Sequence, residues 1–186
     1  METVLRLALT VLGLLAVTVL IEFITHNSII KLHATPVESI EVVTVKEREK
    51  QLDCLAMNIY REAGHEHFEG KVAVAQVTMN RVASPSFPND VCGVVLQKNI
   101  FVEKVVCQFS WYCDSATKAR PINKAAYNES YEVAKKVLLE GFSLPSLTDA
   151  LYYHADYINP NWNLDKVIKI GHHIFYKPKG VKYAQL

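Results

Sequence analysis

The chain has 186 residues, half of them hydrophobic, which is enough for one globular domain with a buried core. Twenty basic residues oppose 19 acidic ones, so the net charge is +1, and no basic block or stripe occurs. This balance argues against a nucleic-acid-binding protein, and no nucleic-acid partner is expected.

The N-terminal segment differs from the rest of the chain. An apolar run without charged residues lies between Arg6 and Glu22. It is shorter than the roughly 20 residues of a membrane-spanning helix and longer than the core of a signal peptide, although residues 1–5 can extend it. We expect residues 1–25 to form a signal-anchor or transmembrane helix. A cleaved signal peptide and a buried helix of a soluble domain are the alternatives.

A tether is expected to follow this segment. Residues 26–49 are largely polar, contain Pro36 and end in a run of alternating charges. We therefore expect the folded domain to occupy residues 50–180.

The chain contains four cysteines, which is compatible with export and with one or two disulfides. Cys54 falls inside an expected helix and is interpreted as a core thiol. Cys92, Cys107 and Cys113 lie in a loop-rich stretch, so a bridge is expected among these three. The pairing stays open.

The first helix of the domain, expected over residues 47–63, carries one acid on its apolar face. Leu52, Leu55, Ile59 and Glu62 share a helical stripe, and Gly64 is expected to end the helix. A carboxyl on an apolar face is partly desolvated, which raises its pKa and suits it to act as a general acid near neutral pH. The alternative is a surface salt bridge.

Helices come first in the remainder and strands last. A second helix is expected from residue 68 to 82 with a buried stripe, a short piece over 91–97, and a third helix over 123–140. The stretch 99–120 mixes aromatic and polar residues and is interpreted as a binding loop. Strands are expected at the end of the domain, over residues 151–155, 167–170 and 173–176. This order predicts an α+β fold, mainly helical with a small antiparallel sheet.

The histidines and serines do not form a recognisable metal site or catalytic triad. His65 and His67 lie two residues apart and His172 and His173 are adjacent, but neither CxxC nor HExxH spacing occurs. Ser110 lacks the Gly-x-Ser-x-Gly setting of a nucleophile. We therefore expect neither a metal nor another cofactor.

Carbohydrate chemistry fits the residue types better. Aromatic rings stack on the apolar faces of sugars, while amides and hydroxyls bind sugar hydroxyl and N-acetyl groups. The chain offers side chains of these kinds, several of them in irregular, polar segments: Gln108, Ser110, Trp111, Tyr112, Tyr152, Tyr153, Asn161 and Trp162. Ordinary core packing is the alternative for each aromatic residue.

Three ordered segments resemble the SleB/CwlJ family of cell wall hydrolases. Residues 59–82 resemble the family's opening block, which reads Tyr-x-Glu-Ala-Arg-Gly-Glu, then Glu-Gly, then a helix ending Asn-Arg-Val. Residues 107–114 resemble its Gln-Phe-Ser-Trp block. Residues 153–162 and 170–176 resemble its closing block. The resemblance covers about residues 54–177.

This resemblance implies a lysozyme-like catalytic domain that cuts peptidoglycan glycan strands between N-acetylmuramic acid and N-acetylglucosamine. It also implies that Glu62 is the catalytic acid and that the product is that of a lytic transglycosylase. Gly64 and His65 stand where the family has Arg-Gly, so the local turn departs from the family pattern.

A lytic transglycosylase needs only one carboxyl, because the muramyl C6 hydroxyl is the nucleophile. Muramidase-type hydrolysis at the same bond is the alternative, with Glu69 or Asp114 as a second carboxylate. The sequence also leaves open a non-catalytic peptidoglycan-binding module or an amidase that acts on the stem peptides. The predicted substrate contacts are Gln108, Ser110, Trp111, Tyr153 and His154.

The expected location follows from the substrate. We expect a membrane-anchored protein whose catalytic domain faces the periplasm or cell wall, with a released or secreted form as the alternative. Either a phage lysin or an envelope-remodelling enzyme fits this description, and the oligomeric state stays open.

Overall fold

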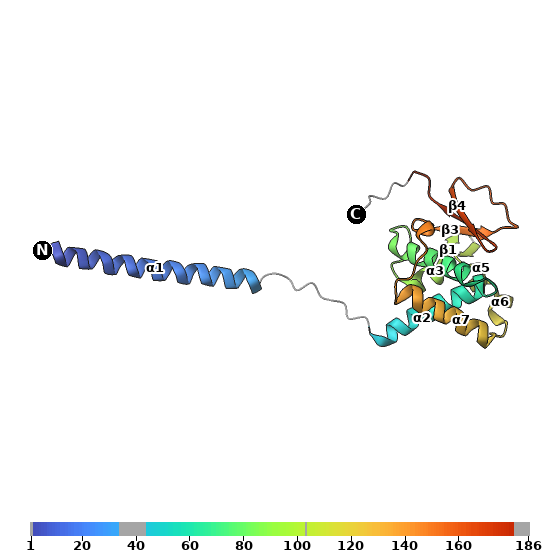
Figure 1. Cartoon of the computed structure of the whole chain (residues 1–186), viewed down its shortest axis with the longest axis horizontal. Coiled ribbons are helices and arrows are strands. Elements are labelled where there is room, and N and C mark those ends of the chain that lie inside the picture. Colours follow the sequence, from blue (N-terminus) through green and yellow to red (C-terminus); the bar gives the residue numbers. More distant parts are fainter. Residues whose placement is uncertain (1, 34–43, 103, 181–186) are drawn as a thin grey trace. The chain divides into compact units, whose positions relative to one another are not determined.

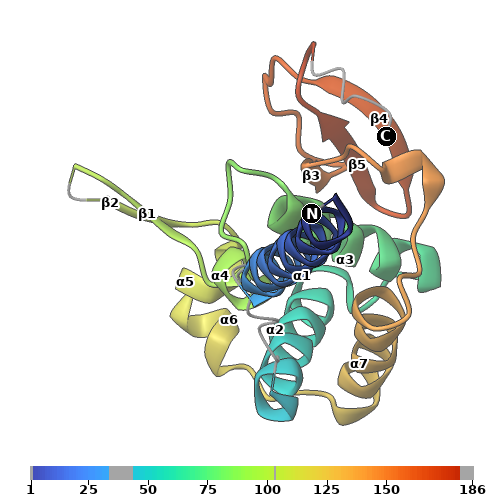
Figure 2. The ribbon, with the colours of Figure 1, turned by 90° about the vertical axis from the view of Figure 1, so that its left-hand side faces the viewer.

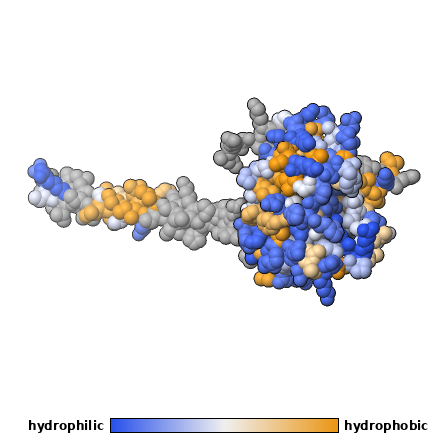
Figure 3. All heavy atoms as spheres, turned by 45° about the vertical axis from the view of Figure 1, so that its right-hand side comes forward, coloured by the Kyte–Doolittle hydropathy of each residue, from blue (hydrophilic) through white to orange (hydrophobic). Residues whose placement is uncertain are grey.

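The computed structural model describes residues 2–33, 44–102 and 104–180, which belong to two units divided near residue 42. The first unit holds helix α1 (Glu2–His33), whose middle part exposes apolar side chains such as Leu12 and Phe23 (Figure 3). Within the described residues, no helix is both long and apolar enough to cross a membrane. The N-terminal anchor expected over residues 1–25 is therefore not confirmed.

Three helices form the frame of the second unit: α2 (Val45–Ala63), α3 (Phe68–Ala83) and α7 (Lys124–Leu138). They pack against one another (Figure 1), and the short α4 (Val91–Val95) packs on α2 and α3. The Thr44 hydroxyl caps α2 by accepting a hydrogen bond from the Glu47 amide. These helices lie where the hydrophobic spacing predicts them.

The apolar stripe of α2 faces the core as expected. Leu52, Leu55 and Ile59 are buried, and the stripe ends at the half-buried Glu62. Beyond the stripe, Gly64 keeps a right-handed backbone conformation, so α2 does not end in a left-handed glycine. A side chain at Gly64 would place its Cβ 2.5 Å from the carbonyl oxygen of Tyr60, which explains the glycine there by close packing.

The stretch interpreted as a binding loop contains strands and short helices, so the prediction that it is an irregular loop was wrong, while its role in binding stays a prediction. Strands β1 (Lys98–Phe101) and β2 (Lys104–Cys107) form a hairpin that projects from the unit, followed by the short helices α5 (Ser110–Cys113) and α6 (Ser115–Ala119) (Figure 2). Ile100 and Val105 are exposed. No hairpin side chain whose burial the structure describes is buried, and a strand without a buried face lacks the alternation that predicts it.

The second sheet covers α3. It contains β3 (Tyr152–Ala155), β4 (Asp165–Ile170) and β5 (His173–Lys177) in the antiparallel order β3-β5-β4, after a short 3₁₀ helix, η1 (Pro145–Leu147). Phe175 of β5 is buried against Ala73 and Val77 of α3. The helical frame with small antiparallel sheets confirms the α+β prediction.

The strand register decides which side chains face the helices. Tyr153 lies opposite Phe175, and Ala155 lies opposite His173. Since side chains alternate along a strand, Tyr153, His173 and Phe175 share the face that packs on α3. His154 and Tyr176 point to the other face.

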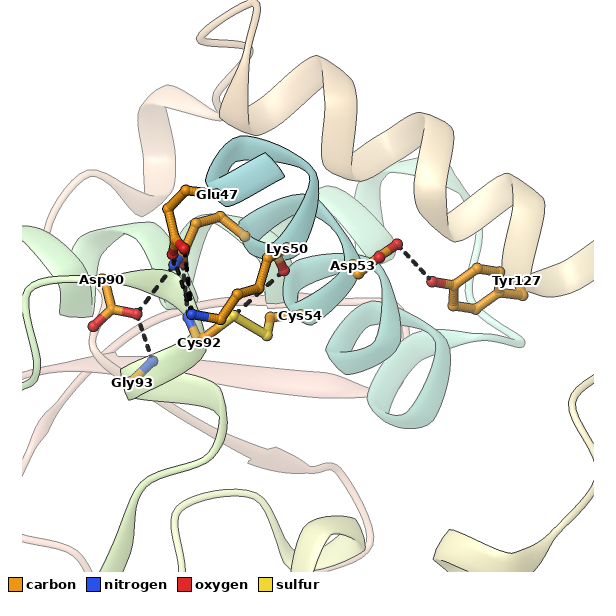
Figure 4. The surroundings of a disulfide bond; sticks show 9 residues. Glu47, Lys50, Asp53, Cys54, Asp90, Cys92, Gly93 and Tyr127 are labelled. Atoms are coloured by element: carbon orange, nitrogen blue, oxygen red, sulfur yellow. Dashed lines mark hydrogen bonds and ion pairs between the residues drawn. A yellow bond between two sulfur atoms is a disulfide. The ribbon is translucent and has the colours of Figure 1, made fainter. Parts of the chain in front are cut away.

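Two disulfides occur, Cys54–Cys92 and Cys107–Cys113. The interpretation of Cys54 as a core thiol was wrong, because it bonds Cys92 of α4 across 38 residues of sequence (Figure 4). Gln51 accepts a hydrogen bond from the Cys92 amide at 2.9 Å and supports the same junction. Helix α4 is thus held to the first part of α2.

The Cys54–Cys92 bridge is expected to contribute more stability than the Cys107–Cys113 bridge. Loop-closure entropy predicts about 4 kcal/mol for a loop of 38 residues and about 2 kcal/mol for a loop of six. Urea unfolding of the Cys54→Ser/Cys92→Ser and Cys107→Ser/Cys113→Ser variants compares the two. Equal losses, or a larger loss for the second variant, would contradict this ranking.

Candidate active site

Glu62 lies in the last turn of α2, where its half-buried carboxyl meets the sheet. Its Oε2 atom accepts a hydrogen bond of 3.2 Å from the hydroxyl of Tyr153. Burial raises the pKa of Glu62, and the hydrogen bond from Tyr153 and the charge of Arg81 offset part of that rise. Glu62 therefore keeps its proton to a higher pH than a free glutamate, as a general acid must.

Tyr153 supplies a neutral donor to this carboxyl. Burial of the hydroxyl and the neighbouring Glu62 raise the pKa of Tyr153 well above its usual range. The hydroxyl therefore stays protonated at physiological pH and donates to Glu62. Tyr153 was predicted as a substrate contact, and the structure brings it directly to the candidate acid.

Arg81 is a functional candidate that the sequence reasoning missed. Its side chain is only 4 % exposed, and its Nε atom donates to the backbone oxygen of Leu151 at 2.8 Å. The guanidinium carbon lies 5.3 Å and 5.2 Å from the ring centroids of Phe87 and Phe109. Arg81 therefore holds the start of β3 and places a buried positive charge near Glu62.

Asn80 supports the same connection. Its side-chain amide donates to the backbone oxygens of Leu147 at 2.7 Å and Ala150 at 2.9 Å. Both acceptors lie just before β3, so Asn80 and Arg81 together fix where Tyr153 enters the sheet. The Asn-Arg-Val ending of the family's opening block was the available signal for these two residues.

The cavity that contains Glu62 has a volume of about 290 Å³. It is lined by the end of α2, the α2–α3 loop, α6 and the segment that leads to α7, including Arg61, Glu66, Thr117, Arg120 and Asn123. A larger cavity of about 610 Å³ lies between the start of α3 and α7 and shares only Glu66 with the first. We assign the chemistry to the smaller cavity because it holds the desolvated acid.

Trp111 belongs to the core and not to an open groove. It is 7 % exposed, and its indole nitrogen donates to Oδ1 of Asn58 at 3.0 Å. The Asn58 amide in turn donates to the Thr78 hydroxyl at 3.2 Å. This buried network ties α5 to α2 and α3, and it argues against a direct contact between Trp111 and substrate.

Replacing Trp111 by phenylalanine tests this reassignment. The change leaves Oδ1 of the buried Asn58 without its donor, which costs about 1–3 kcal/mol. We expect thermal unfolding at a lower temperature, with KM for glycan strands unchanged among the folded molecules. A rise in KM without loss of stability would return Trp111 to the substrate contacts.

His154 lies on the face of the sheet opposite to Tyr153. Its Nε2 atom hydrogen-bonds the hydroxyl of Tyr176, and its ring contacts that of Trp162 at a centroid distance of 5.3 Å. This position argues against a contact with a substrate held at Glu62. Gln108 and Ser110 lie at the junction of β2 and α5, half-buried and exposed respectively, and their substrate contacts stay predictions.

Neither candidate second carboxylate lines the cavity of Glu62. Asp114 caps α6: it accepts hydrogen bonds from the Thr117 hydroxyl and from the amides of Ala116 and Thr117, and these bonds, the hydroxyl's first, lower its pKa. Glu69 is exposed in the first turn of α3. Across the ranges that the structure describes, no group of three or more His, Cys, Asp or Glu residues is placed to hold a metal ion.

The domain is thus an α+β fold whose candidate site centres on one desolvated carboxyl. The model of the family described as cell wall hydrolase matches residues 65–176, beginning just after Glu62. Two solved structures are similar to the chain. The catalytic domain of Bacillus cereus SleB is 29 % identical, with a TM-score of 0.51 over 69 % of this chain and 91 % of that domain. The catalytic domain of the germination-specific lytic transglycosylase SleB from Bacillus anthracis is 31 % identical, with a TM-score of 0.51 over 69 % and 95 %.

The chain belongs to the cell wall hydrolase family. Among whole proteins, the spore cortex-lytic enzyme of Bacillus cereus is 32 % identical over 137 residues, covering 69 % of this chain and 45 % of the relative. The enzyme of the same name from Bacillus subtilis is 32 % identical over 130 residues, covering 65 % and 35 %. The chain therefore spans less than half the length of these relatives. None of these relatives is described as a phage lysin, and that prediction gains no support.

Proposed function

We propose that this protein cleaves the glycan strands of peptidoglycan between N-acetylmuramic acid and N-acetylglucosamine, as a lytic transglycosylase. The observation that carries the proposal is the desolvated carboxyl of Glu62 at the end of α2, which accepts a hydrogen bond from the Tyr153 hydroxyl. Membership of the cell wall hydrolase family and the similarity to SleB catalytic domains support the substrate class.

Protonated Glu62 donates to the glycosidic oxygen while the bond to C1 of the muramyl residue breaks through an oxocarbenium-like transition state. The resulting carboxylate then takes the proton of the muramyl C6 hydroxyl. The C6 oxygen attacks C1 and closes a 1,6-anhydro ring. Glu62 ends the cycle protonated, so no second carboxylate is required.

The surroundings of Glu62 favour this route over hydrolysis. Hydrolysis requires a second carboxylate to activate water or to act as nucleophile. Asp114 is engaged in capping α6, Glu69 is exposed, and neither lines the cavity of Glu62. Glu66 also lines the cavity, but its carboxylate accepts a hydrogen bond from the His172 amide at the sheet. Glu62 is therefore the acid left for the reaction, which suits a reaction whose nucleophile belongs to the substrate.

Mass spectrometry of digested peptidoglycan tests the proposal. Muropeptides with 1,6-anhydro-muramyl ends are expected. Reducing muramyl ends would instead identify a muramidase-type hydrolase, and free stem peptides an amidase. Binding to peptidoglycan without any product would identify a non-catalytic module.

We also propose that the catalytic domain works outside the cytoplasm. Two disulfides support this location, because they are rare in reducing compartments. Fractionation of cells producing the full chain should place the disulfide-bonded protein in the envelope or the medium. Recovery of the reduced protein in the cytoplasm would contradict this location, and the division between membrane and soluble envelope fractions tests the N-terminal anchor.

A further inference from the structure

We propose that Glu66 is a positioning residue that sets the place of the Tyr153 hydroxyl on Glu62, acting through the β4–β5 turn and His173. This inference rests on the proposed function, because it assigns Glu66 a role in the action of the Glu62 acid. Glu66 lies four residues after Glu62, in the loop between α2 and α3, and its own carboxyl meets the sheet at a different point.

The Glu66 side chain is built into the contact between this loop and the sheet. It is 9 % exposed, and its Oε1 atom accepts a hydrogen bond of 3.1 Å from the amide of His172. A Cβ atom at Gly171 would lie 1.9 Å from Oε2 of Glu66, and Gly171 also has a φ of +56°. The turn between β4 and β5 therefore leaves the space that this carboxylate fills.

His173 connects Glu66 with Tyr153. Its Nδ1 atom lies 3.6 Å from Oε1 of Glu66, and its ring meets the Tyr153 ring edge-on at a centroid distance of 5.2 Å. The imidazole is buried, and Nδ1 has no hydrogen-bond partner within the described ranges. Burial lowers the pKa of His173, so the ring is neutral at physiological pH and acts through packing and its dipole.

The last contact in this series orients the acid. The Tyr153 hydroxyl donates to Oε2 of Glu62, which leaves Oε1 to carry the transferable proton. A shift of the β4–β5 turn moves His173, then Tyr153, and weakens that hydrogen bond. Two carboxylates four residues apart thus have different tasks: Glu62 transfers the proton, and Glu66 fixes the strand that holds Glu62.

Several neighbouring groups act on the pKa values of Glu62 and His173. Tyr153 and Arg81 act on the pKa of Glu62. The groups that act on His173 are Glu66, His172, Asp156 and His154. The hydrogen bond from Tyr153 lowers the pKa of Glu62. Loss of this hydrogen bond therefore keeps Glu62 protonated to higher pH and shifts the alkaline limb of the pH–rate profile to higher pH.

The test compares kcat/KM against pH on purified glycan strands for Tyr153→Phe, Glu66→Gln and the double variant. Glu66→Gln keeps the shape of the side chain, but it gives the His172 amide a neutral and weaker acceptor and removes the charge facing His173, so the β4–β5 turn is held less tightly. We expect each single change to shift the alkaline limb to higher pH. The maximal rate should fall by about tenfold for Tyr153→Phe and by less for Glu66→Gln. The double variant should match Tyr153→Phe.

The control is Glu140→Gln, which removes an exposed carboxylate at the end of α7 and should leave the profile unchanged. A folded Glu66→Gln variant whose alkaline limb does not move, or a double variant with additive shifts, would overturn the proposal. If Glu66→Gln does not fold, His173→Phe keeps a ring against Tyr153 without Nδ1 and must reproduce the upward shift. Absence of cleavage by the wild-type protein and the control alike would refute the proposed function instead.

Discussion

Replacing Glu62 by glutamine is expected to reduce cleavage of peptidoglycan by about 10²–10⁴-fold, the usual contribution of general acid–base catalysis. Glutamine has nearly the shape of the protonated acid and can still accept the hydrogen bond from Tyr153, but it has no proton to transfer. Quantifying anhydro-muramyl ends after digestion measures the loss. Binding to insoluble peptidoglycan should persist, because the substituted side chain still fits the cavity.

Glu49→Gln is a matched control, since Glu49 is an exposed acid near the start of the same helix. It should cleave like the wild-type protein. Retained activity in Glu62→Gln would remove Glu62 from its assigned role. Loss of binding together with activity would show that the substitution damaged the site and not only the chemistry.

The Glu62→Gln substitution should also stabilise the folded protein at pH values above the pKa of Glu62. Burial raises this pKa in the folded state, so the folded protein holds the proton more tightly than the unfolded chain. The stability that this proton supplies is present at low pH and is lost as the pH rises through the raised pKa. A glutamine does not ionise and avoids the loss, as expected for an active-site residue kept at a cost in stability.

Thermal melts at several pH values measure this effect. The melting temperature of Glu62→Gln relative to wild type should increase from acid to alkaline pH. A difference that stays constant with pH would mean that Glu62 is no more desolvated in the folded protein than in the unfolded one.

Local sequence patterns predicted the helical frame of this fold and the position of Glu62 at the end of an apolar helix face. The stripe that joins Leu55 and Ile59 to Glu62 depends only on helical periodicity, and the structure keeps it intact. The strands around Tyr153 and Phe175 likewise follow from runs of aromatic and branched residues. These features are set by residues a few positions apart.

Features that depend on partners far away in the chain were harder to predict. Tyr153 and His154 are adjacent, and only the pairing of β3 with β5 decides which of them faces the helices. Trp111 occurs in a stretch that mixes aromatic and polar residues. Nothing local reveals that its indole forms a hydrogen bond in the core with Asn58, 53 residues earlier. Cys54 looks like part of an apolar face until α4 folds back onto α2.

Arg81 shows the same limit, since it lies off the apolar stripe of α3 and meets Leu151 70 residues later in the chain. Replacing it by methionine is expected to cost about 2–3 kcal/mol of stability, the upper range for losing a hydrogen bond made by a charged group. The Leu151 oxygen loses its charged donor, and the rings of Phe87 and Phe109 lose a cation.

The Arg81→Met variant should also change the pH profile, because the positive charge of Arg81 lowers the pKa of Glu62. Without that charge Glu62 holds its proton to higher pH, so the alkaline limb of kcat/KM moves upward while the protein unfolds at lower urea concentration. Arg81→Lys separates the two effects. It keeps a positive charge and should leave the limb closer to wild type, yet a lysine cannot reproduce the planar guanidinium between the two rings and should still lose stability. A methionine variant as stable as wild type would mean that Arg81 does not hold β3. An alkaline limb that shifts to lower pH would mean that the charge of Arg81 does not lower the pKa of Glu62.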